Sequence, residues 1–401
     1  MKILMVSDVY FPRVNGVSTS IQTFRRELAG LGHEVDLVAP QYPASCADDG
    51  RTLRVPSRRV PFDPEDRMMK PGALRALLPG LRGRGYDIVH VQTPFVAHHA
   101  GVQIADGLGL PRVETYHTFF EEYLFHYVPF MPKSVMRGLS RRLSRTQCNR
   151  MDALVVPSSA MRDRLAGYGV RVPMHVIPTG IPMAQFAGGD GTAFRLRHGI
   201  AGNRPMLLYV GRVAFEKNIG FLVRVLERVR ESVPDVLLTI AGEGPALDRL
   251  RKLVNGRGLA GNVLFVGYLD RNGALLDCYR AADAFVFASR TETQGLVLLE
   301  AMALGVPVVS TAVMGTRDIV GPRRAALVPE DDEEDFARHV VALLGDAGLR
   351  ARLAAQGPAY VAEWSAGALA RRMAAAYRDV IASARTGMGP ARAAAAGTAP
   401  S

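Results

Sequence analysis

The chain has 401 residues, of which 48% are hydrophobic and 22% are charged. This composition excludes a disordered chain and leaves room for two globular domains of ordinary size. Its three cysteines, Cys46, Cys148 and Cys278, are scattered without a CxxC pair, so neither a disulfide framework nor a zinc site is predicted. The formal net charge of +11 indicates a negatively charged partner, such as nucleotide phosphates, anionic lipid or nucleic acid.

The first residues, MKILMVSDVYF, do not resemble an export signal, because the apolar run is short and reaches Asp8 at once. No apolar stretch of about 20 residues follows that would span a bilayer. We therefore expect a cytoplasmic protein.

Two successive sets of short apolar runs alternate with helical patterns, such as the apolar residues at 17, 21, 24 and 28. Runs that are apolar throughout are typical of parallel strands covered on both faces. The first set is KILMVSD (2–8), EVDLVAP (34–40), DIVHVQT (87–93), RVETYH (112–117), ALVVPS (153–158) and HVIPTG (175–180). The second set is MLLYVG (206–211), DVLLTIAGEG (235–244), NVLFVGYL (262–269), AFVFAS (284–289), VPVVST (306–311) and AALVPE (325–330).

This alternation predicts an α/β protein with two doubly wound domains, 1–180 and 181–363, joined near the segment PTGIPMAQF. A helix over about residues 364–385 is expected to pack back on the first domain, and 386–401 to form a disordered tail. Open parallel sheets bind ligands outside the carboxyl ends of their strands, so a ligand is expected in the crevice between the domains.

The stretch RTETQGLVLLEAMALGVPVVS (290–310) carries two acids, Glu292 and Glu300. Glu292 is predicted in the loop after a strand, and Glu300 inside a helix that ends at Gly305. The free amides at the start of that helix predict a phosphate site, with Glu300 in reach of a sugar hydroxyl. The alternative is a solvated loop acid and a helix-surface acid. The residues predicted to supply the amides are Thr293, Gln294, Gly295 and Leu296.

Two cations follow another predicted strand in YVGRVAFEKN, where Arg212 comes after Gly211 and Lys217 lies five residues further. Such cations can neutralise a diphosphate leaving group as its charge develops. Solvated surface cations are the alternative. Two more strand-end loops are suited to holding a nucleotide base, and they contain Gly242, Glu243, Gly267 and Tyr268.

These motifs together resemble the retaining GT-B glycosyltransferases of family four, over nearly the whole chain and most strongly from Met206 to Arg317. The resemblance implies a GT-B fold, with two Rossmann-like domains facing each other across a cleft and a nucleotide-sugar donor. It implies that Glu292 lies by the donor sugar and that Glu300 holds the ribose. The diphosphate would be held by Arg212 and Lys217.

In the N-terminal half, Asn15 and Gly16 fall between the first strand and the first helix, where glycine permits close approach of a donor phosphate. An ordinary turn is the alternative, and the GxGxxG fingerprint of a nicotinamide dehydrogenase is absent. His117 ends a strand and could be a structural histidine. The family resemblance implies instead that it binds or polarises the transferred sugar.

The expected chemistry is transfer with retention at the anomeric carbon, by a covalent intermediate or by front-face attack with the leaving phosphate as base. No essential metal and no other cofactor is expected. The acidic run EDDEED (330–335) is predicted to be a solvated loop rather than a ligand set.

A basic amphipathic helix is predicted from Pro132, with cations recurring every four residues and Val135, Leu139 and Leu143 on the opposite side. Such a helix can lie in an anionic membrane interface, with aromatic neighbours that could admit acyl chains. Alternatively, the apolar stripe packs on the domain and the basic face is solvated. The predicted membrane or acceptor residues are Phe119, Phe120, Tyr123, Lys133, Arg137, Arg141 and Arg145.

Gln294 stands where many family members have phenylalanine, and TETQGL with TYHTFFEEYLFHY looks like the branch that glycosylates diacylglycerol. We therefore expect a hexose, from UDP-glucose, to reach diacylglycerol at the inner face of the cytoplasmic membrane. GDP-mannose-dependent transfer to a phosphoinositide or glycan is the alternative, and a nucleotide-sugar epimerase on the same fold is less favoured. A nucleic-acid partner is not expected, because no docking surface or known module is present.

Overall fold

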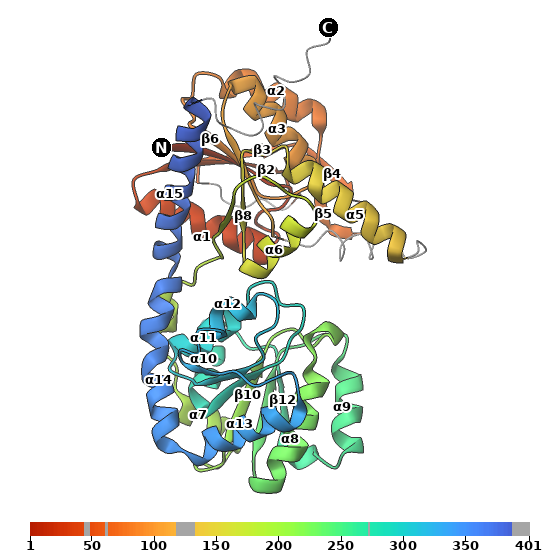
Figure 1. Ribbon diagram of the computed structural model, residues 1–401, viewed down its shortest axis with the longest axis vertical. Helices are drawn as coiled ribbons and strands as arrows, with labels where there is room; N and C mark the ends of the chain where they lie inside the picture. The colour runs from red at the N-terminus through yellow and green to blue at the C-terminus, as the bar shows by residue number, and fades with distance from the viewer. Residues whose placement is uncertain (44–48, 61–62, 118–132, 272, 387–401) are drawn as a thin grey trace. The chain divides into compact units, whose positions relative to one another are not determined.

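The structure is a computed structural model that describes residues 1–43, 49–60, 63–117, 133–271 and 273–386. It divides into two compact units, the first formed by Met1–Gly180 with the chain from Ala366 onward, and the second by Ile181–Ser365 (Figure 1). The predicted acceptor residues Phe119, Phe120 and Tyr123 lie outside the described residues, as does the tail from residue 387.

The first unit contains a parallel sheet with the strand order β3-β2-β1-β6-β7-β8-β9. Its strands are β1 (Lys2–Val6), β2 (Glu34–Pro40), β3 (Thr52–Val55), β6 (Ile88–Val91), β7 (Arg112–Thr115), β8 (Ala153–Val156) and β9 (Met174–Val176). Its helices are α1 (Gly16–Gly30), α2 (Pro71–Leu81), α3 (Val96–Leu108), α5 (Lys133–Cys148), α6 (Ser159–Gly167) and α15 (Ala366–Arg385).

The C-terminal helix α15 is part of this first unit and lies beside α1 (Figure 1). Both helices contribute to one hydrophobic cluster, in which Phe24 and Leu28 of α1 share a core with Met373 and Tyr377 of α15. Tyr377 also reaches the sheet, where its hydroxyl lies 2.6 Å from Nδ1 of His90 on β6. Residues almost 300 positions apart therefore stabilise the same sheet.

An edge of the first unit was not predicted from the sequence. Strand β3 and the antiparallel hairpin of β4 (Ser57–Val60) and β5 (Asp63–Met69) arise from RTLRVPSRRV and the residues after it. Charged and apolar residues are mixed in this segment, because β3 is an edge strand and β4 and β5 form a separate two-stranded sheet, and both bury fewer side chains than the centre of the large sheet. It therefore lacks the continuous apolar run that marks the central strands.

The second unit contains a parallel sheet with the strand order β12-β11-β10-β13-β14-β15. Its strands are β10 (Met206–Val210), β11 (Leu237–Ala241), β12 (Val263–Gly267), β13 (Ala284–Phe287), β14 (Val308–Ser310) and β15 (Ala326–Leu327). Its helices are α7 (Gly191–Arg197), α8 (Ile219–Ser232), α9 (Leu247–Gly256), α10 (Ala274–Ala281), α11 (Leu296–Ala303), α12 (Thr316–Val320), α13 (Glu333–Gly345) and α14 (Ala347–Val361). Short 3₁₀ turns occur at Met183–Phe186, Phe215–Lys217, Ala260–Asn262 and Ala362–Trp364.

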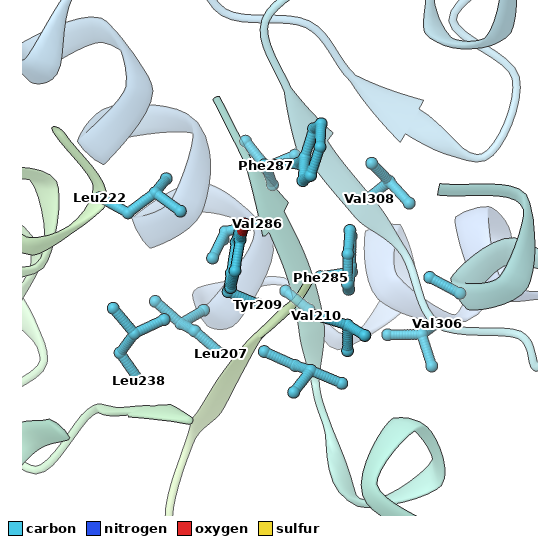
Figure 2. Close-up of a cluster of buried hydrophobic side chains, with 14 of the residues drawn as sticks. Leu207, Tyr209, Val210, Leu222, Leu238, Phe285, Val286, Phe287, Val306 and Val308 are labelled. Carbon is cyan, nitrogen blue, oxygen red and sulfur yellow. The ribbon is translucent and has the colours of Figure 1, made fainter. Parts of the chain in front are cut away.

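Aromatic side chains pack at the centre of the second unit's core (Figure 2). The rings of Tyr209 and Phe287 stack with centroids 6.0 Å apart, and those of Phe285 and Phe287 with centroids 6.2 Å apart. These residues come from the adjacent strands β10 and β13. Two of the predicted functional loops follow these strands, so the packing of the rings holds the starting points of both loops in place.

The acidic run at 330–335 was wrongly predicted to be a solvated loop. Asp332 caps α13, where its carboxylate accepts hydrogen bonds from the amides of Glu334 and Asp335. Asp331 pairs with Arg290, and Glu333 pairs with Arg224. Acids in the first turn also interact favourably with the helix dipole. The run therefore stabilises the start of a helix.

In the part of the chain that the structure describes, no helix is both long and apolar enough to cross a membrane.

Candidate functional site

Three of the predicted donor-binding glycines lie together where β10, β11 and β12 end. The amide of Gly211 donates to the carbonyl of Ala241, and that of Gly242 to the carbonyl of Gly267. Gly242 has a φ of 143°, and a Cβ there would lie 2.0 Å from the carbonyl oxygen of Gly211. Only glycine fits at this position, because both the backbone conformation and the available space exclude a side chain.

Other predicted residues surround this strand-end surface. Arg212 is exposed, and its carbonyl accepts a hydrogen bond from Tyr209 at 3.2 Å. Glu243 lies beside Gly267, with Oε1 3.4 Å from the place where a Cβ would sit. Tyr268 follows directly and is 72% exposed, so one face of its ring is open to a planar ligand.

The structure brings Lys217 and Glu292 together, although 75 positions separate them. The Nζ of Lys217 donates to Oε2 of Glu292 at 2.8 Å, and both side chains are about one-fifth exposed. Lys217 ends a 3₁₀ turn after β10, whereas Glu292 lies in the loop after β13. This ion pair places a cation and a carboxylate at the carboxyl ends of adjacent strands.

The loop from Thr293 to Gly295 leads into α11, where Gly295 has a φ of 87°. Within the described residues no side chain caps α11, so its first amides can take an anion, as predicted for Leu296. Gln294 is 9% exposed.

Gly315 was missed in the sequence and supports this loop. Its amide donates to the carbonyl of Glu292 at 2.9 Å, and a Cβ there would lie 2.0 Å from the carbonyl oxygen of Thr293. Thr316 then packs against Gly295, since its methyl lies 3.3 Å from where a Cβ on Gly295 would sit. Gly315 and the start of α12 therefore hold the loop from Thr293 to Gly295 in place.

Glu300 is 2% exposed, so the interpretation of Glu300 as a helix-surface acid is wrong. Its Oε2 accepts from the hydroxyl of Tyr279 at 2.9 Å, and its Oε1 accepts from Arg271 at 3.1 Å. Neither partner was singled out in the sequence.

In the first unit, Asn15 caps α1, since its Oδ1 accepts from the amide of Ser18 at 2.9 Å. Ser18 in turn accepts from the amide of Asn15, which completes a capping box. Gly16 is exposed, and a Cβ there would meet nothing within 4 Å. The side chain of Asn15 therefore has a structural role, while the open space at Gly16 leaves the start of α1 accessible.

His117 follows β7, and its Nε2 lies 3.2 Å from Oε1 of Gln92, which follows β6. Burial lowers the pKa of His117 to about 4. Near neutral pH the imidazole is therefore uncharged and can exchange hydrogen bonds with a hydroxyl without adding positive charge.

The helix α5 packs against the first unit through a face that differs from the predicted apolar stripe. Its buried face is made by Met136, Ser140, Ser144, Gln147 and Cys148. Leu139 is 49% exposed and Leu143 is 37% exposed, so the alternative in which these leucines pack on the domain is wrong.

Two of the four predicted cations of α5 are described, and both are exposed. Arg141 lies over the ring of Tyr168 at 5.3 Å, and the stem of Arg145 lies beside Gly169. The side chains of Lys133 and Arg137 lie outside the described residues. Exposed leucines and exposed arginines therefore occupy the same helix.

The stability of the first unit is expected to fall in acid, because His90 is buried and His117 is partly buried. Burial lowers the pKa of His90 to about 3, with a smaller effect from the charge of His117. Unfolded histidines bind a proton below about pH 6.5, whereas these two stay neutral in the fold until about pH 4 or 3. The free energy of unfolding therefore has its full value above pH 6.5. As the pH drops below 6.5, it decreases by up to about 1.4 kcal/mol per pH unit for each histidine.

Hydrogen exchange of the β6 amides, measured at pH 7 and at pH 5, reports the free energy of unfolding of the first unit and checks this prediction. We expect His90→Gln to reduce the dependence of this stability on pH. An equal slope in the parent and in His90→Gln would contradict the prediction.

Comparison with known proteins gives matches to both halves of the chain. The family model described as "Glycosyltransferase Family 4" matches residues 14–185, and "Glycosyl transferases group 1" matches residues 191–360. The chain is 34% identical over 324 residues to an alpha-monoglucosyldiacylglycerol synthase of Streptococcus pneumoniae, covering 77% of this chain and 71% of that protein. It belongs to glycosyltransferase family four. The resemblance predicted from the sequence motifs is therefore confirmed.

Two further similarities extend this result. A GDP-mannose-dependent alpha-mannosyltransferase of Mycolicibacterium smegmatis is 30% identical over 365 residues, covering 88% of this chain and 92% of the relative. The structure of Anabaena Alr3699/HepE in complex with UDP matches with a TM-score of 0.73 at 16% identity, covering 94% of this chain and all of that one. The predicted GT-B fold is confirmed, and the chain is a glycosyltransferase of the hexosyltransferase type.

Proposed function

We propose that this protein is a retaining hexosyltransferase that moves glucose from UDP-glucose to diacylglycerol and forms an α-glycosidic glycolipid. In the reaction, the bond between the anomeric carbon and the diphosphate breaks and the nucleoside diphosphate leaves. The acceptor hydroxyl forms the new bond on the same face of the sugar, and its proton passes to the departing diphosphate. A mechanism with a covalent intermediate and one with front-face attack both break and form these same bonds.

We propose that Arg212 and Lys217 neutralise the diphosphate, together with the amides at the start of α11. Glu292 would lie beside the transferred hexose, and Glu300 would accept hydrogen bonds from the ribose. The ion pair of Lys217 with Glu292 supports this assignment, because it holds the proposed phosphate-binding cation next to the carboxylate proposed to lie beside the sugar. In the first unit, we propose that the open start of α1 at Gly16 and the neutral imidazole of His117 bind groups of the substrates.

The base of the nucleotide would lie over the carboxyl ends of β11 and β12. Tyr268 supplies an exposed ring for stacking, and Gly242 and Gly267 leave the backbone open. The complex of Alr3699/HepE with UDP supports a nucleotide donor of this class. No group of three or more histidine, cysteine or acidic side chains that could hold a metal ion occurs in the described residues.

The exposed surface of α5 carries the proposal of a lipid acceptor. Leu139 and Leu143 are open to solvent on a helix that also exposes Arg141 and Arg145. Leucines can enter the boundary of the acyl chains while arginines meet anionic headgroups. The similarity to the diacylglycerol synthase supports the same acceptor. We infer that the enzyme works at the inner surface of the cytoplasmic membrane.

A second candidate function is transfer of mannose from GDP-mannose to a phosphoinositide or glycan. The mannosyltransferase of Mycolicibacterium smegmatis favours it, because the match covers more of both chains than the match to the synthase does.

Incubation with UDP-glucose or GDP-mannose and diacylglycerol vesicles, followed by mass analysis of the lipids, separates these functions. We expect a hexosyl-diacylglycerol from UDP-glucose. A mannosylated product formed only from GDP-mannose would favour the second candidate. Release of an altered sugar without any acceptor would indicate an epimerase.

We also expect Glu300→Gln to weaken nucleotide binding by about 1–3 kcal/mol, because a charged acceptor of hydroxyl hydrogen bonds becomes a neutral one. Calorimetric titration with UDP checks this, with Glu231→Gln on the exposed face of α8 as the matched control. Equal affinity of Glu300→Gln and the parent would contradict the ribose assignment.

A further inference from the structure

The carboxylate of Glu300 is held at both of its oxygens by residues from outside α11. The hydroxyl of Tyr279 on α10 lies 2.9 Å from Oε2, and Nη2 of Arg271 in the loop before α10 lies 3.1 Å from Oε1. The side chain of Glu300 is 3% exposed, whereas that of Arg271 is 64% exposed. One partner is therefore internal and the other lies at the surface.

Tyr279 is a fixed donor to this carboxylate. Its ring is fully buried and lies 5.8 Å from that of Phe285 in the core of the second unit. Burial, and then the charge of Glu300, raise the pKa of Tyr279 well above its ordinary value, so the phenol keeps its proton. The carbonyl of Val297 lies further away, at 3.5 Å, so the proton points to Glu300.

Arg271 approaches the same carboxylate from the solvent side. It follows β12 by four positions, in the loop that begins with the exposed Tyr268. A carboxylate offers about four lone-pair sites, and the two donors occupy one on each oxygen. Among the described residues no third donor contacts this buried carboxylate, and rotation of the carboxylate would break both contacts, so its remaining lone pairs keep a fixed direction.

We propose that Tyr279 and Arg271 are positioning residues that orient the carboxylate of Glu300 toward the ribose hydroxyls of the donor nucleotide. This inference rests on the proposed function. An acceptor that is already held in one orientation loses less conformational freedom when the nucleotide binds. A purely structural role would instead stabilise the buried charge and leave recognition of the ribose unchanged.

Calorimetric titration with UDP and with 2′,3′-dideoxy-UDP separates these roles, with GDP and its dideoxy form used if UDP does not bind. The parent should prefer UDP about tenfold or more, as expected for hydrogen bonds to a charged group. In Tyr279→Phe and in Arg271→Gln this preference should fall at least about threefold, while affinity for the dideoxy nucleotide stays near that of the parent. Arg271→Lys should restore part of the preference.

Tyr360→Phe is the matched control, because Tyr360 is also buried in the second unit and donates to a carbonyl, that of Ile319, at 2.7 Å. It should keep the full preference for UDP. If the parent prefers UDP and both variants keep that preference, the positioning role is overturned while the ribose role of Glu300 stands. If the parent binds both nucleotides equally, the ribose role itself is wrong and the inference falls with it.

Discussion

We expect Lys217→Ala and Arg212→Ala each to lower the turnover of hexose transfer by about 10²–10³, the usual effect of removing a preorganised electrostatic group. Charge grows on the diphosphate as the bond to the sugar breaks, so both cations are most valuable in the transition state. Loss of Lys217 has a second effect, because it leaves the carboxylate of Glu292 without the cation that lies 2.8 Å away.

Steady-state kinetics with donor and acceptor varied separately checks this prediction. Turnover should fall far more than the affinity for the acceptor. Lys252→Ala on α9 removes an exposed cation from the same unit and serves as the control. Turnover within about twofold of the parent in either site variant would show that the residue does not neutralise the leaving group.

The second large effect is expected from the cations of α5. Replacing Lys133, Arg137, Arg141 and Arg145 by glutamine removes about 1 kcal/mol of attraction per charge near anionic lipid. Together these losses should weaken binding to anionic vesicles by two to three orders of magnitude and reduce transfer to diacylglycerol in vesicles. Hydrolysis of the donor by water should stay unchanged, because the donor residues are untouched.

Co-sedimentation with vesicles of graded anionic content measures this binding. Salt at 1 M should weaken vesicle binding by the parent as the four substitutions do, because it shortens the screening length to about 3 Å. Replacing Lys70, Arg75 and Arg82 by glutamine removes exposed charge elsewhere in the first unit and should have little effect. Leu139→Asn with Leu143→Asn tests the apolar contribution. Binding that does not depend on anionic lipid would make α5 a structural helix only.

The two sheets could be predicted from the sequence because their central strands are buried on both faces. Runs such as EVDLVAP and MLLYVG became β2 and β10, in which nearly every residue is buried. The hairpin of β4 and β5 could not be predicted, because its sequence mixes charged and apolar residues and has no continuous apolar run. The alternative in which the apolar stripe of α5 packs on the domain was wrong, because residues such as Met136, Ser140 and Ser144 fill the contact with the first unit.

The candidate site could be located from motifs, but its internal contacts could not. The sequence pattern correctly predicted Glu292 in the loop after β13 and Glu300 within α11. Arg271 and Tyr279 lie 29 and 21 positions before Glu300, so only the fold brings them to its carboxylate. Gly315 was missed for the same reason, because the need for glycine arises from close approach to the backbone of Thr293.

The anomeric configuration of the lipid formed from UDP-glucose and diacylglycerol in anionic vesicles tests the central claim most directly. The sugar is α-linked in the donor, so retention predicts a single α-glucosyl-diacylglycerol, which the coupling of its anomeric proton identifies by nuclear magnetic resonance. A β-linked product would contradict retention. The absence of any glucosylated lipid from vesicles that bind the protein would contradict the proposed acceptor.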